Sequence, residues 1–332
     1  MDPISLRRHL ELAVKSDYPE ERACKTRIGA VVSALAAASL DIAEMISLGA
    51  LAAPADGAAR GFNIRAHEAL VQSLRGAGIR AFISTEADET LAIDESGALA
   101  VEASPLSGST GLDANMTGGT IFAITEAGGE NGALPAGDPL AAGFVVYGCR
   151  TVLALTLGDG VDIFTQDRRD RSWKLTAPGV RIPDVAHEYA VNAANDRRRN
   201  GAVRAFADDG FNDGEPAFNS RWTGSLVADA FHILVRGGVL LDPAEARPGC
   251  ERGRSRLLCE ARPIAYVVEQ AGGRASTGCA RILDLRAASP HARTPLILGS
   301  RPMVERIERL HSRPESLADV SPLFGKRGLF RA

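Results

Sequence analysis

The chain has 332 residues, of which 45% are hydrophobic and 24% are charged, and this composition excludes a disordered, collagen-like or coiled-coil protein. Its 38 lysine and arginine residues against 41 aspartate and glutamate residues give a formal net charge of −3. A balance so near neutrality offers no electrostatic reason to bind nucleic acid or an anionic membrane. We therefore expect the partner to be a small molecule or a second copy of the chain.

The cysteines and the N-terminal segment predict a cytoplasmic protein. The N-terminal segment carries charges every few residues and lacks the apolar region of a signal peptide. No two cysteines form a C-x-x-C pair, a pattern typical of reduced thiols rather than of a zinc site. The five cysteines are Cys24, Cys149, Cys250, Cys259 and Cys279.

The first half of the chain predicts helices followed by strands. Thr26 is expected to cap a helix over 28–53, which polar residues interrupt at helical spacing, so that it packs in the core and falls short of a membrane span. A second helix is predicted over 64–75. Strands are predicted over 80–83, 99–103, 119–124, 143–148, 152–157 and 161–165. The strand over 99–103 is expected to end abruptly at Ser104.

A composition shift in the middle of the chain predicts a domain boundary near residue 180. Two runs dense in arginine and aspartate, 167–171 and 196–200, lie on either side of it. Beyond it, Ser225 is expected to cap a helix that ends at Arg236. The other elements predicted there are a strand over 239–241, a helix that begins near Pro263, a strand over 294–298 and a helix over 302–310. We expect an N-terminal domain over 1–180, a C-terminal domain over 181–314 and a tail over 315–332.

The sharpest local motif is a small-residue loop after the predicted strand at 99–103. Residues 104–111 read SPLSGSTG. The backbone N–H groups of Gly108, Ser109 and Thr110 can form an anion-binding nest, and the glycine lets a phosphate approach the main chain. The loop therefore favours phosphate binding, although small-residue loops are also common simple turns.

Other catalytic motifs are missing from the sequence. No G-x-S-x-G nucleophile elbow is present, and the glycine pairs lie after helices or in loops, which argues against a Ser-His-Asp hydrolase and against dinucleotide binding. The histidines have no metal-ligand spacing and are expected to be packing or surface residues. These histidines include His67, His187, His232 and His291.

Several segments, in the same order along the chain, resemble the class I fructose-1,6-bisphosphatases. The stretch over 101–124 resembles that family's strand ending in D-P-L-D-G-S-S, and 83–89 resembles its acidic turn. Further matches lie at 220–238, 256–278 and 293–300, so that the resemblance covers about residues 20–312. It implies an α/β protein with the layered α/β/α/β/α sugar-phosphatase fold and two mixed sheets, assembled as a homo-oligomer, by resemblance a tetramer.

The resemblance implies hydrolysis of the 1-phosphate of fructose 1,6-bisphosphate with several Mg²⁺ ions held by carboxylates about 4 Å apart. Two of the family's metal ligands match Glu86 and Glu260. The other three fall on the neutral residues Thr85, Ser104 and Ser107. The aspartate that helps to activate the attacking water falls on Asn63. We therefore expect the Mg²⁺ site to be weak or absent, with at most one ion between Glu86, Glu260 and a substrate phosphate.

Four further acidic residues near these positions could replace the lost ligands. Acidic residues in turns and at strand edges are usually solvated, so we expect them to leave the metal site unrepaired. They are Asp88, Glu89, Glu102 and Asp113, of which Asp113 is expected to be a structural hydrogen-bonding residue.

The resemblance also implies a pocket for the second phosphate of the substrate. Asn192 matches the family's asparagine, Arg221 its arginine donated across the subunit interface, and Arg254 lies where a lysine reaches the sugar phosphate. Arg256 matches a second arginine. Three tyrosines of the pocket fall on Asn195, Trp222 and Asp242, and a carboxylate at the last position is expected to repel a phosphate.

Two functions of different class follow from these residues. The first is a degenerate family member with little or no Mg²⁺-dependent phosphatase activity, which binds a sugar phosphate or inorganic phosphate or modulates an active relative. The alternative is an active Mg²⁺-dependent phosphatase on fructose 1,6-bisphosphate or a related sugar phosphate, with a rearranged ligand set.

Overall fold

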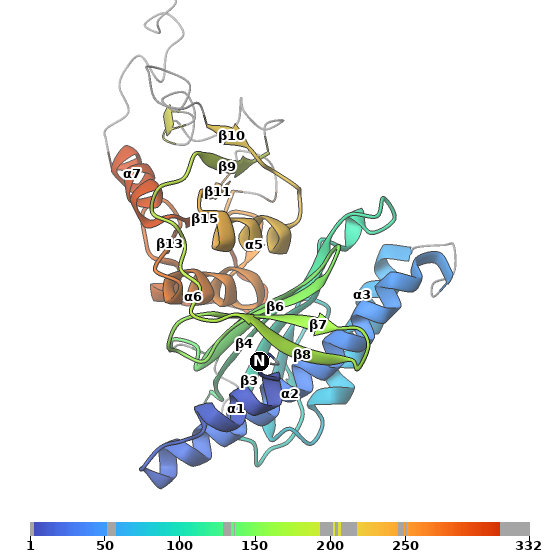
Figure 1. Cartoon of the computed structure of the whole chain (residues 1–332). Coiled ribbons are helices and arrows are strands. Elements are labelled where there is room, and N and C mark those ends of the chain that lie inside the picture. The colour runs from blue at the N-terminus through green and yellow to red at the C-terminus, as the bar shows by residue number, and fades with distance from the viewer. Residues whose placement is uncertain are drawn as a thin grey trace, which may run out of the picture.

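The computed structural model describes residues 3–51, 58–128, 134–135, 137–192, 202, 205–206, 218–244, 249 and 251–312. Two mixed sheets and three layers of helices alternate through the molecule (Figure 1). This architecture confirms the predicted layered α/β/α/β/α fold with two mixed sheets. The predicted tail over 315–332 lies outside the described residues.

The first helical layer covers the outer face of the larger sheet (Figure 1). It contains α1 (Leu6–Ala13), α2 (Pro19–Leu48) and α3 (Ala58–Leu74). A short 3-10 turn, η1 (Gly49–Leu51), follows α2. The buried side chains of these helices form one core with the facing side of the sheet, and this core includes Val31, Leu70 and Phe122.

The larger sheet has eight strands in the order β2-β1-β3-β4-β5-β6-β7-β8. β1 and β3 pair in parallel and the other pairs are antiparallel. The strands are β1 (Ile79–Ser84), β2 (Leu91–Ala92), β3 (Leu99–Ser107), β4 (Gly118–Glu126), β5 (Ala141–Tyr147), β6 (Thr151–Thr156), β7 (Asp162–Asp167) and β8 (Ser172–Ala177).

The middle layer holds α5 (Leu226–Arg236) and α6 (Arg262–Gln270) between the two sheets. The second sheet has the strand order β10-β9-β11-β15-β13, and α7 (Arg301–His311) covers its outer face (Figure 1). Its strands are β9 (Glu188–Val191), β10 (Asn219–Ser220), β11 (Val239–Asp242), β13 (Arg274–Ser276) and β15 (Leu296–Gly299). A separate two-stranded ribbon joins β12 (Ser255–Arg256) to β14 (Arg293–Thr294).

The expected start of the long apolar helix was wrong. α2 begins at Pro19, whose fixed φ suits the first helical position, and Glu20 and Glu21 follow in the first turn. Thr26 lies inside the helix, where its hydroxyl donates to the Arg22 carbonyl at 2.8 Å. There the hydroxyl forms its hydrogen bond with the preceding turn of the same helix. A threonine before an apolar run therefore does not by itself mark the start of a helix.

The expectation that the apolar stretch falls short of a membrane span was also wrong. α2 is long and apolar enough to cross a membrane by length and composition alone. Its apolar side chains Val31, Val32 and Leu35 are fully buried in the core shared with the larger sheet. The packing within the fold, rather than the composition, identifies α2 as a core helix.

β3 extends beyond its expected end, so that the predicted ligand positions Ser104 and Ser107 lie within the sheet. The strand continues through Ser104 and Pro105 to Ser107, and all nine of its residues are buried. Its register against β4 shifts between Ser104 and Ser107. Proline has no N–H to donate to a ladder, so this shift lets the strand accommodate Pro105. The Pro105 carbonyl accepts a hydrogen bond from the Thr120 hydroxyl at 2.7 Å.

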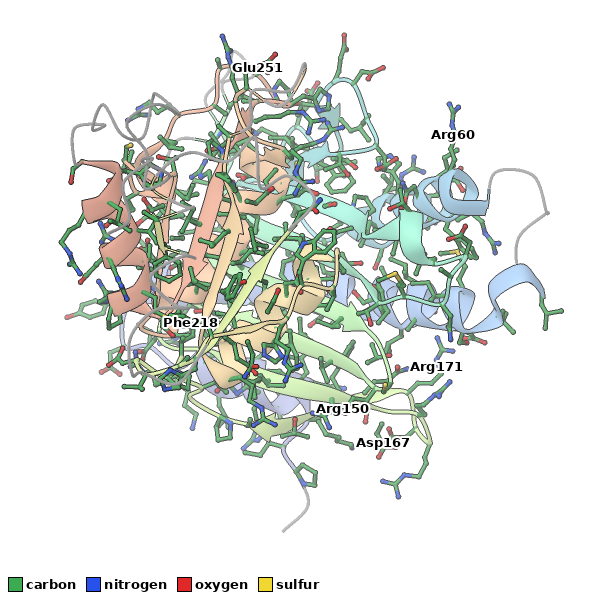
Figure 2. All side chains as sticks on the ribbon, turned by 90° about the horizontal axis from the view of Figure 1, so that it is seen from above. Arg60, Arg150, Asp167, Arg171, Phe218 and Glu251 are labelled. Atoms are coloured by element: carbon green, nitrogen blue, oxygen red, sulfur yellow. The ribbon has the colours of Figure 1, made fainter. Side chains whose placement is uncertain are left out.

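The polar run over 167–171 is the turn of a hairpin that the sequence analysis did not predict. Arg169 contacts Asp167 in this turn between β7 and β8, and Arg171 contacts Asp41 and Glu44 on α2. Figure 2 shows Asp167 and Arg171 close together at one end of the molecule. The second run, 196–200, lies outside the described residues. The domain boundary near residue 180 remains a prediction, although the strands of the two sheets lie on opposite sides of it.

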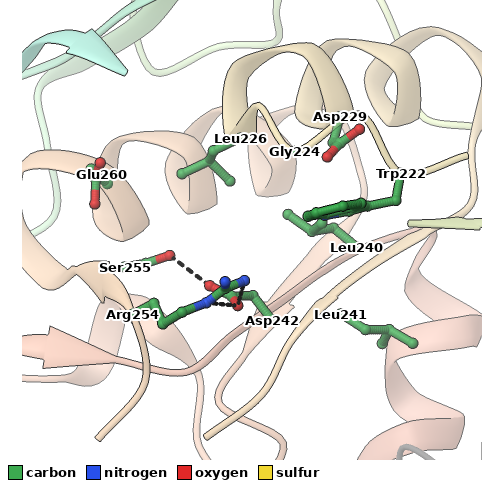
Figure 3. A pocket seen from close by; sticks show the side chains of 10 residues that line it. All are labelled: Trp222, Gly224, Leu226, Asp229, Leu240, Leu241, Asp242, Arg254, Ser255 and Glu260. Carbon is green, nitrogen blue, oxygen red and sulfur yellow. Dashed lines mark hydrogen bonds and ion pairs between the residues drawn. The ribbon is translucent and has the colours of Figure 1, made fainter. Parts of the chain in front are cut away.

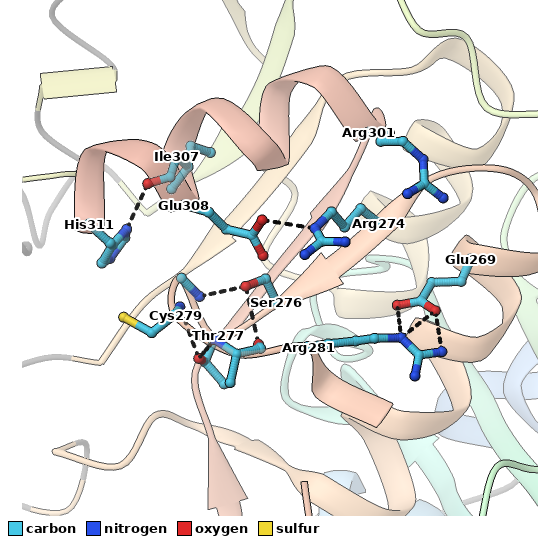
Figure 4. Close-up of polar contacts among 12 residues, drawn as sticks. Glu269, Arg274, Ser276, Thr277, Cys279, Arg281, Arg301, Ile307, Glu308 and His311 are labelled. Atoms are coloured by element: carbon cyan, nitrogen blue, oxygen red, sulfur yellow. Dashed lines mark hydrogen bonds and ion pairs between the residues drawn. The ribbon is translucent and has the colours of Figure 1, made fainter. Parts of the chain in front are cut away.

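Two ion pairs fasten the C-terminal elements around α6 (Figure 4). Arg281, before the 3-10 turn η5 (Ile282–Asp284), contacts Glu269 of α6 at 2.7 Å. Arg274 of β13 contacts Glu308 of α7 at 2.9 Å. All four side chains are partly or largely shielded from solvent, so these contacts are stronger than pairs on an open surface.

Gly119 lets the middle helical layer approach the larger sheet. A Cβ at this position of β4 would lie 2.1 Å from the Val145 carbonyl oxygen and 2.7 Å from the Val227 side chain of α5. Real side-chain atoms do not approach so closely, and neither neighbour is the end of a flexible chain. Position 119 of β4, where α5 packs against the strand, therefore accommodates only glycine.

We expect Gly119→Ala to lower the free energy of unfolding by about 1–3 kcal/mol, because the added methyl group overpacks the contact between α5 and β4. Urea unfolding measures the change. The matched control is Gly61→Ala within α3, where nothing lies within 4 Å of the new methyl group. That variant should gain about 0.5–1 kcal/mol from helix propensity. Equal stability of the two variants would contradict this account.

Candidate active site

The ends of β1 and β3 bring the predicted ligand positions to one edge of the larger sheet. The two strands run in parallel, so their carboxyl ends meet at the same edge. The Thr85 N–H donates to the Ala103 carbonyl at 3.1 Å, which holds the acidic turn against β3. Glu86 follows in that turn and is exposed, and its carboxylate accepts from the Thr85 hydroxyl at 3.2 Å.

Glu260 reaches the same edge from the opposite half of the chain. It lies in a π-helical turn, η4 (Leu257–Ala261), immediately before α6. The Cys259 thiol lies 3.7 Å from the Ile83 carbonyl oxygen and packs with Ile83, which places the turn beside β1. One carboxylate oxygen of Glu260 accepts from the Arg256 N–H at 2.8 Å, and burial raises the pKa of this carboxyl group.

The small-residue loop leaves the end of β3 through a left-handed glycine. Gly108 has φ 78° and precedes the 3-10 turn η2 (Ser109–Gly111). A side chain is disfavoured at this φ, and the turn brings successive backbone N–H groups onto one side, as an anion-binding nest requires. Ser109 is buried, whereas Thr110 is exposed.

A hydroxyl that the sequence analysis assigned to helix capping faces this loop instead. Ser225 precedes α5, but its side chain makes no capping hydrogen bond. Its oxygen is buried and has no hydrogen-bond partner among the described residues, and a Cβ on Gly108 would lie only 3.0 Å from it. Buried polar atoms are nearly always paired, so an unpartnered hydroxyl beside the loop fits a site that is completed by a ligand.

Asn63 and His67 approach the site from α3, which packs against β3 and η2. The Asn63 side-chain oxygen is buried, and no described residue is its hydrogen-bond partner. One helical turn later, the His67 Nδ1 lies 2.9 Å from the Ser84 hydroxyl, and the ring stacks on Phe82. Burial lowers the pKa of His67, against the opposing effect of the nearby Glu86 and Glu68 carboxylates. His67 was expected to be a packing or surface residue, and only the contact with the end of β1 links it to the site.

The side chains at this edge of the sheet determine whether the Mg²⁺ ions implied by the resemblance could bind there. Within the described ranges, no group of three or more histidine, cysteine, aspartate or glutamate side chains could hold a metal ion. The neutral residues Thr85, Ser104 and Ser107 therefore do not fit a cluster of several Mg²⁺ ions. Two carboxylates together with substrate phosphate oxygens are a set that suits a single Mg²⁺, and the resemblance assigns such positions to Glu86 and Glu260.

A pocket of about 240 Å³ opens beside η4 and the start of α5 (Figure 3). We call it the Asp242 pocket. Its lining residues come from α5, β11, β12 and the segments before them, and are Trp222, Gly224, Leu226, Asp229, Leu240, Leu241, Asp242, Arg254, Ser255 and Glu260. Among the predicted substrate residues, Trp222 and Arg254 belong to it. The sequence analysis did not identify Asp229 and Ser255, because a helical aspartate and a serine after an arginine carry no motif of their own.

The three predicted anion-binding arginines are each engaged by another side chain. Arg254 donates from Nε and Nη2 to one oxygen of Asp242, at 2.9 and 2.6 Å. Arg221 contacts Glu188 at 3.3 Å, and Arg256 contacts the Nδ1 of His291. Asn192 lies just after β9, and Asn195 lies outside the described residues. The carboxylates of Asp242 and Glu188 thus reduce the positive charge that Arg254 and Arg221 offer to an anion, whereas Arg256 keeps its charge and shares one N–H group with His291.

Glu102 does not behave as the expected solvated acid. Its side chain on β3 is fully buried, and one oxygen accepts from the Thr125 hydroxyl at 3.1 Å. The other oxygen has no hydrogen-bond partner in the part of the chain that the structure describes. Burial raises its pKa to about 7, against the opposing effect of the buried Arg262 guanidinium. Arg262 itself donates to the carbonyls of Pro135 and Gly137. Glu102 is therefore a buried titratable group on β3, two residues before the predicted ligand position Ser104.

Comparison with known proteins gives consistent matches along the chain. The model of the fructose-1-6-bisphosphatase N-terminal domain matches residues 24–178, and that of the C-terminal domain matches residues 182–312. A fructose-1,6-bisphosphatase class 1 of Rhodopseudomonas palustris (strain BisB5) is 47% identical over 326 residues, covering 92% of this chain and 94% of the relative. The class 1 protein of Bradyrhizobium diazoefficiens is 45% identical over 341 residues, covering 95% and 96%.

Solved structures agree with these matches. The crystal structure of Leishmania major fructose-1,6-bisphosphatase in holo form has a TM-score of 0.86 and 25% sequence identity, covering 94% of this chain and 100% of that chain. The apo form of the same protein has a TM-score of 0.82 and 26% identity over the same coverage.

We expect the stability of the protein to fall as the pH rises from 5 to 8, because of Glu102. Its folded pKa of about 7 lies above the usual 4.5, so the folded state retains a proton that the unfolded chain has lost in this range. Stabilisation is greatest below about pH 4.5 and falls by on the order of 3 kcal/mol through pH 7. Urea unfolding of the wild type and of Glu102→Gln at four pH values checks this, since the variant should show a flatter slope. Glu126→Gln, at the exposed end of β4, should keep the wild-type slope; an unchanged slope in Glu102→Gln would contradict the assignment.

Proposed function

Because the chain belongs to the fructose-1,6-bisphosphatase family, we propose that it is a Mg²⁺-dependent phosphatase acting on fructose 1,6-bisphosphate or a related sugar phosphate. The observation that carries this proposal is the similarity to class 1 relatives over more than nine tenths of both chains, at 42–47% identity. The phosphate loop at the end of β3 and the carboxylates Glu86 and Glu260 support it. This proposal replaces the degenerate interpretation as the leading one.

The proposed reaction is hydrolysis of a phosphate monoester. A water oxygen forms a bond to phosphorus, the bond from phosphorus to the sugar oxygen breaks, and the sugar oxygen receives a proton. In this proposal Glu86 and Glu260 hold one Mg²⁺, which when bound polarises the phosphoryl oxygens. The backbone N–H groups of residues 108–110 and the Ser225 hydroxyl hold the phosphate. The unpartnered Asn63 oxygen accepts a hydrogen bond from the attacking water and orients it.

We extend the proposal to the site of attack, the assembly and the cellular location of the protein. We propose attack at the 1-phosphate of the substrate, a homotetrameric assembly in which Arg221 contributes across the interface, and a cytoplasmic location. Arg221 supports the second point because more than half of its side chain is exposed in the single chain.

The neutral ligand positions favour a second candidate function. Thr85, Ser104 and Ser107 provide hydroxyls where the family provides carboxylates, and hydroxyls leave the charge of Mg²⁺ unbalanced. A chain with this donor set can bind a sugar phosphate through its loop and hydrolyse it little or not at all. Such a protein would act as a binder or as a subunit that modulates an active relative. The overall similarity to class 1 enzymes favours the first candidate.

Phosphate release from fructose 1,6-bisphosphate in excess Mg²⁺ or Mn²⁺ separates the two candidates. An active enzyme should turn over about once per second or faster. Glu86→Ala and Glu260→Ala should each lower kcat by at least about 100-fold, since each removes half of the carboxylates available to the ion. The matched control Glu95→Ala removes an exposed acid from the turn between β2 and β3 and should leave kcat unchanged. No release by the wild type would support the second candidate and overturn the first.

A gain-of-ligand variant tests the role of the neutral positions. Thr85→Glu, Ser104→Asp and Ser107→Asp together should bind Mn²⁺ at least about tenfold more tightly than the wild type in calorimetric titration. Without metal the variant should melt at a lower temperature, because Ser104 and Ser107 are buried and charges there lack partners, and added metal should restore the Tm. The neutral control carries Thr85→Gln, Ser104→Asn and Ser107→Asn and should gain no metal affinity. A Tm that does not respond to metal would show that these positions no longer converge on one ion.

A further inference from the structure

The direction of the Glu86 carboxylate depends on the backbone of the acidic turn, residues 84–89. The Glu86 side chain is exposed, so packing does not hold it. The pairing of β1 with β3 ends at Ser84, and the next strand, β2, begins only at Leu91. The contacts that hold the turn between these strands therefore decide where Glu86 points.

His67 contacts the start of the turn from α3. Its Nδ1 lies 2.9 Å from the Ser84 hydroxyl oxygen, which also accepts from the Glu86 N–H at 3.2 Å. Ser84 is only 1% exposed, so the proton of its hydroxyl needs an acceptor within the protein. The Nδ1 of His67 provides that acceptor, and this bond keeps the lone pairs of the hydroxyl directed at Glu86. The ring of Phe82 stacks on the imidazole and supports it in this position.

His291 contacts the other end of the turn from the opposite half of the chain. Its Nε2 lies 3.1 Å from the Asp88 carbonyl oxygen, and its Nδ1 contacts the Arg256 guanidinium. A carbonyl only accepts hydrogen bonds and a guanidinium only donates them, so Nε2 carries the proton and Nδ1 accepts. These two partners thus assign one tautomer, in which both ring nitrogens of His291 are used.

The same histidine links the acidic turn to the segment that carries Glu260. The Arg256 N–H donates to the Glu260 carboxylate at 2.8 Å. β12, which contains Arg256, pairs with β14, and β14 begins two residues after His291. His291 therefore couples the position of the turn around Glu86 to the position of Glu260.

We propose that His67 and His291 are positioning residues that hold the acidic turn at its two ends and fix the direction of the Glu86 carboxylate. That Glu86 then binds a metal ion rests on the proposed function. A carboxylate held in one direction loses less conformational freedom when an ion binds, so the two histidines raise the affinity for the metal. Neither histidine touches the substrate or transfers a proton in this role.

Amide hydrogen exchange over residues 84–89 of the metal-free full chain, followed by mass spectrometry, tests the hold on the turn. His67→Phe keeps a flat ring but has no acceptor, and His291→Phe loses both polar contacts. Each variant should raise the exchange rate of this segment at least about tenfold. The matched control His9→Phe removes a histidine that packs on Phe164 of β7, near the other edge of the sheet, and should leave the rate unchanged. An unchanged rate in either test variant would overturn the role of that histidine.

Calorimetric titration with Mn²⁺ tests the consequence for the candidate metal ligand. His67→Phe and His291→Phe should each bind Mn²⁺ about tenfold less tightly than the wild type, because outer-shell partners contribute this much to metal affinity. His67→Asn places a side-chain oxygen near the position of Nδ1 and should keep the affinity within about threefold of the wild type. Asparagine does not titrate, so a loss in His67→Asn as large as in His67→Phe would overturn positioning through an acceptor.

Ser84→Ala tests the path from His67 to Glu86 and does so even where a histidine variant does not fold. It removes the hydroxyl that makes both hydrogen bonds and should reproduce the faster exchange and the weaker Mn²⁺ binding of His67→Phe. The double variant should be no weaker than Ser84→Ala alone, and additive losses would overturn this path. Absence of Mn²⁺ binding by the wild type would contradict the proposed function, whereas the exchange rates would still decide whether the histidines hold the turn.

Discussion

The burial of β3 along its whole length is the constraint on which the rest of the structure depends. All nine residues of the strand are buried, because β1 and β4 flank it and helices cover both faces of the sheet. A charge on such a strand needs a metal ion, an ion pair or a proton. Ser104 and Ser107 satisfy this constraint as neutral hydroxyls, whereas Glu102 satisfies it by a raised pKa near the buried Arg262. The chemistry at this edge of the sheet therefore depends on whether each position carries a neutral hydroxyl or a carboxyl group with a raised pKa.

The same strand also determines where a ligand meets the protein. The shift in register before Ser107 lets the chain pass Pro105 and then turn through the left-handed Gly108. The close approach of α5 to β4 at Gly119 brings the segment around Ser225 against this turn. The small-residue loop at 104–111, the Ser225 hydroxyl and the Asp242 pocket therefore lie together as a consequence of one packing arrangement between the larger sheet and the middle helices.

Contacts with neighbouring side chains change how strongly the arginines near the site attract a phosphate. In the sequence they lie at positions where the resemblance implies basic residues that hold the sugar phosphate. In the structure Arg254 pairs with Asp242, Arg221 with Glu188, and Arg256 with a histidine. A guanidinium already held by a carboxylate attracts a phosphate far less than a free one, because the two charges cancel at short range.

The sequence by itself predicted most strands, because the glycines, prolines and apolar runs act locally on the backbone. The family and the layered fold followed from the resemblance of several motifs in the same order along the chain. That resemblance also implies neutral ligand positions at Thr85, Ser104 and Ser107, and these positions, like the domain boundary near residue 180, remain predictions. The sequence misplaced the start of α2 and the end of β3, where packing overrides local propensity. Only the tertiary structure decided that Glu102 is buried, that Ser225 faces the loop and that Asp242 neutralises Arg254. These properties depend on contacts between residues far apart in the chain, and such contacts exist only once the sheets and helices have packed.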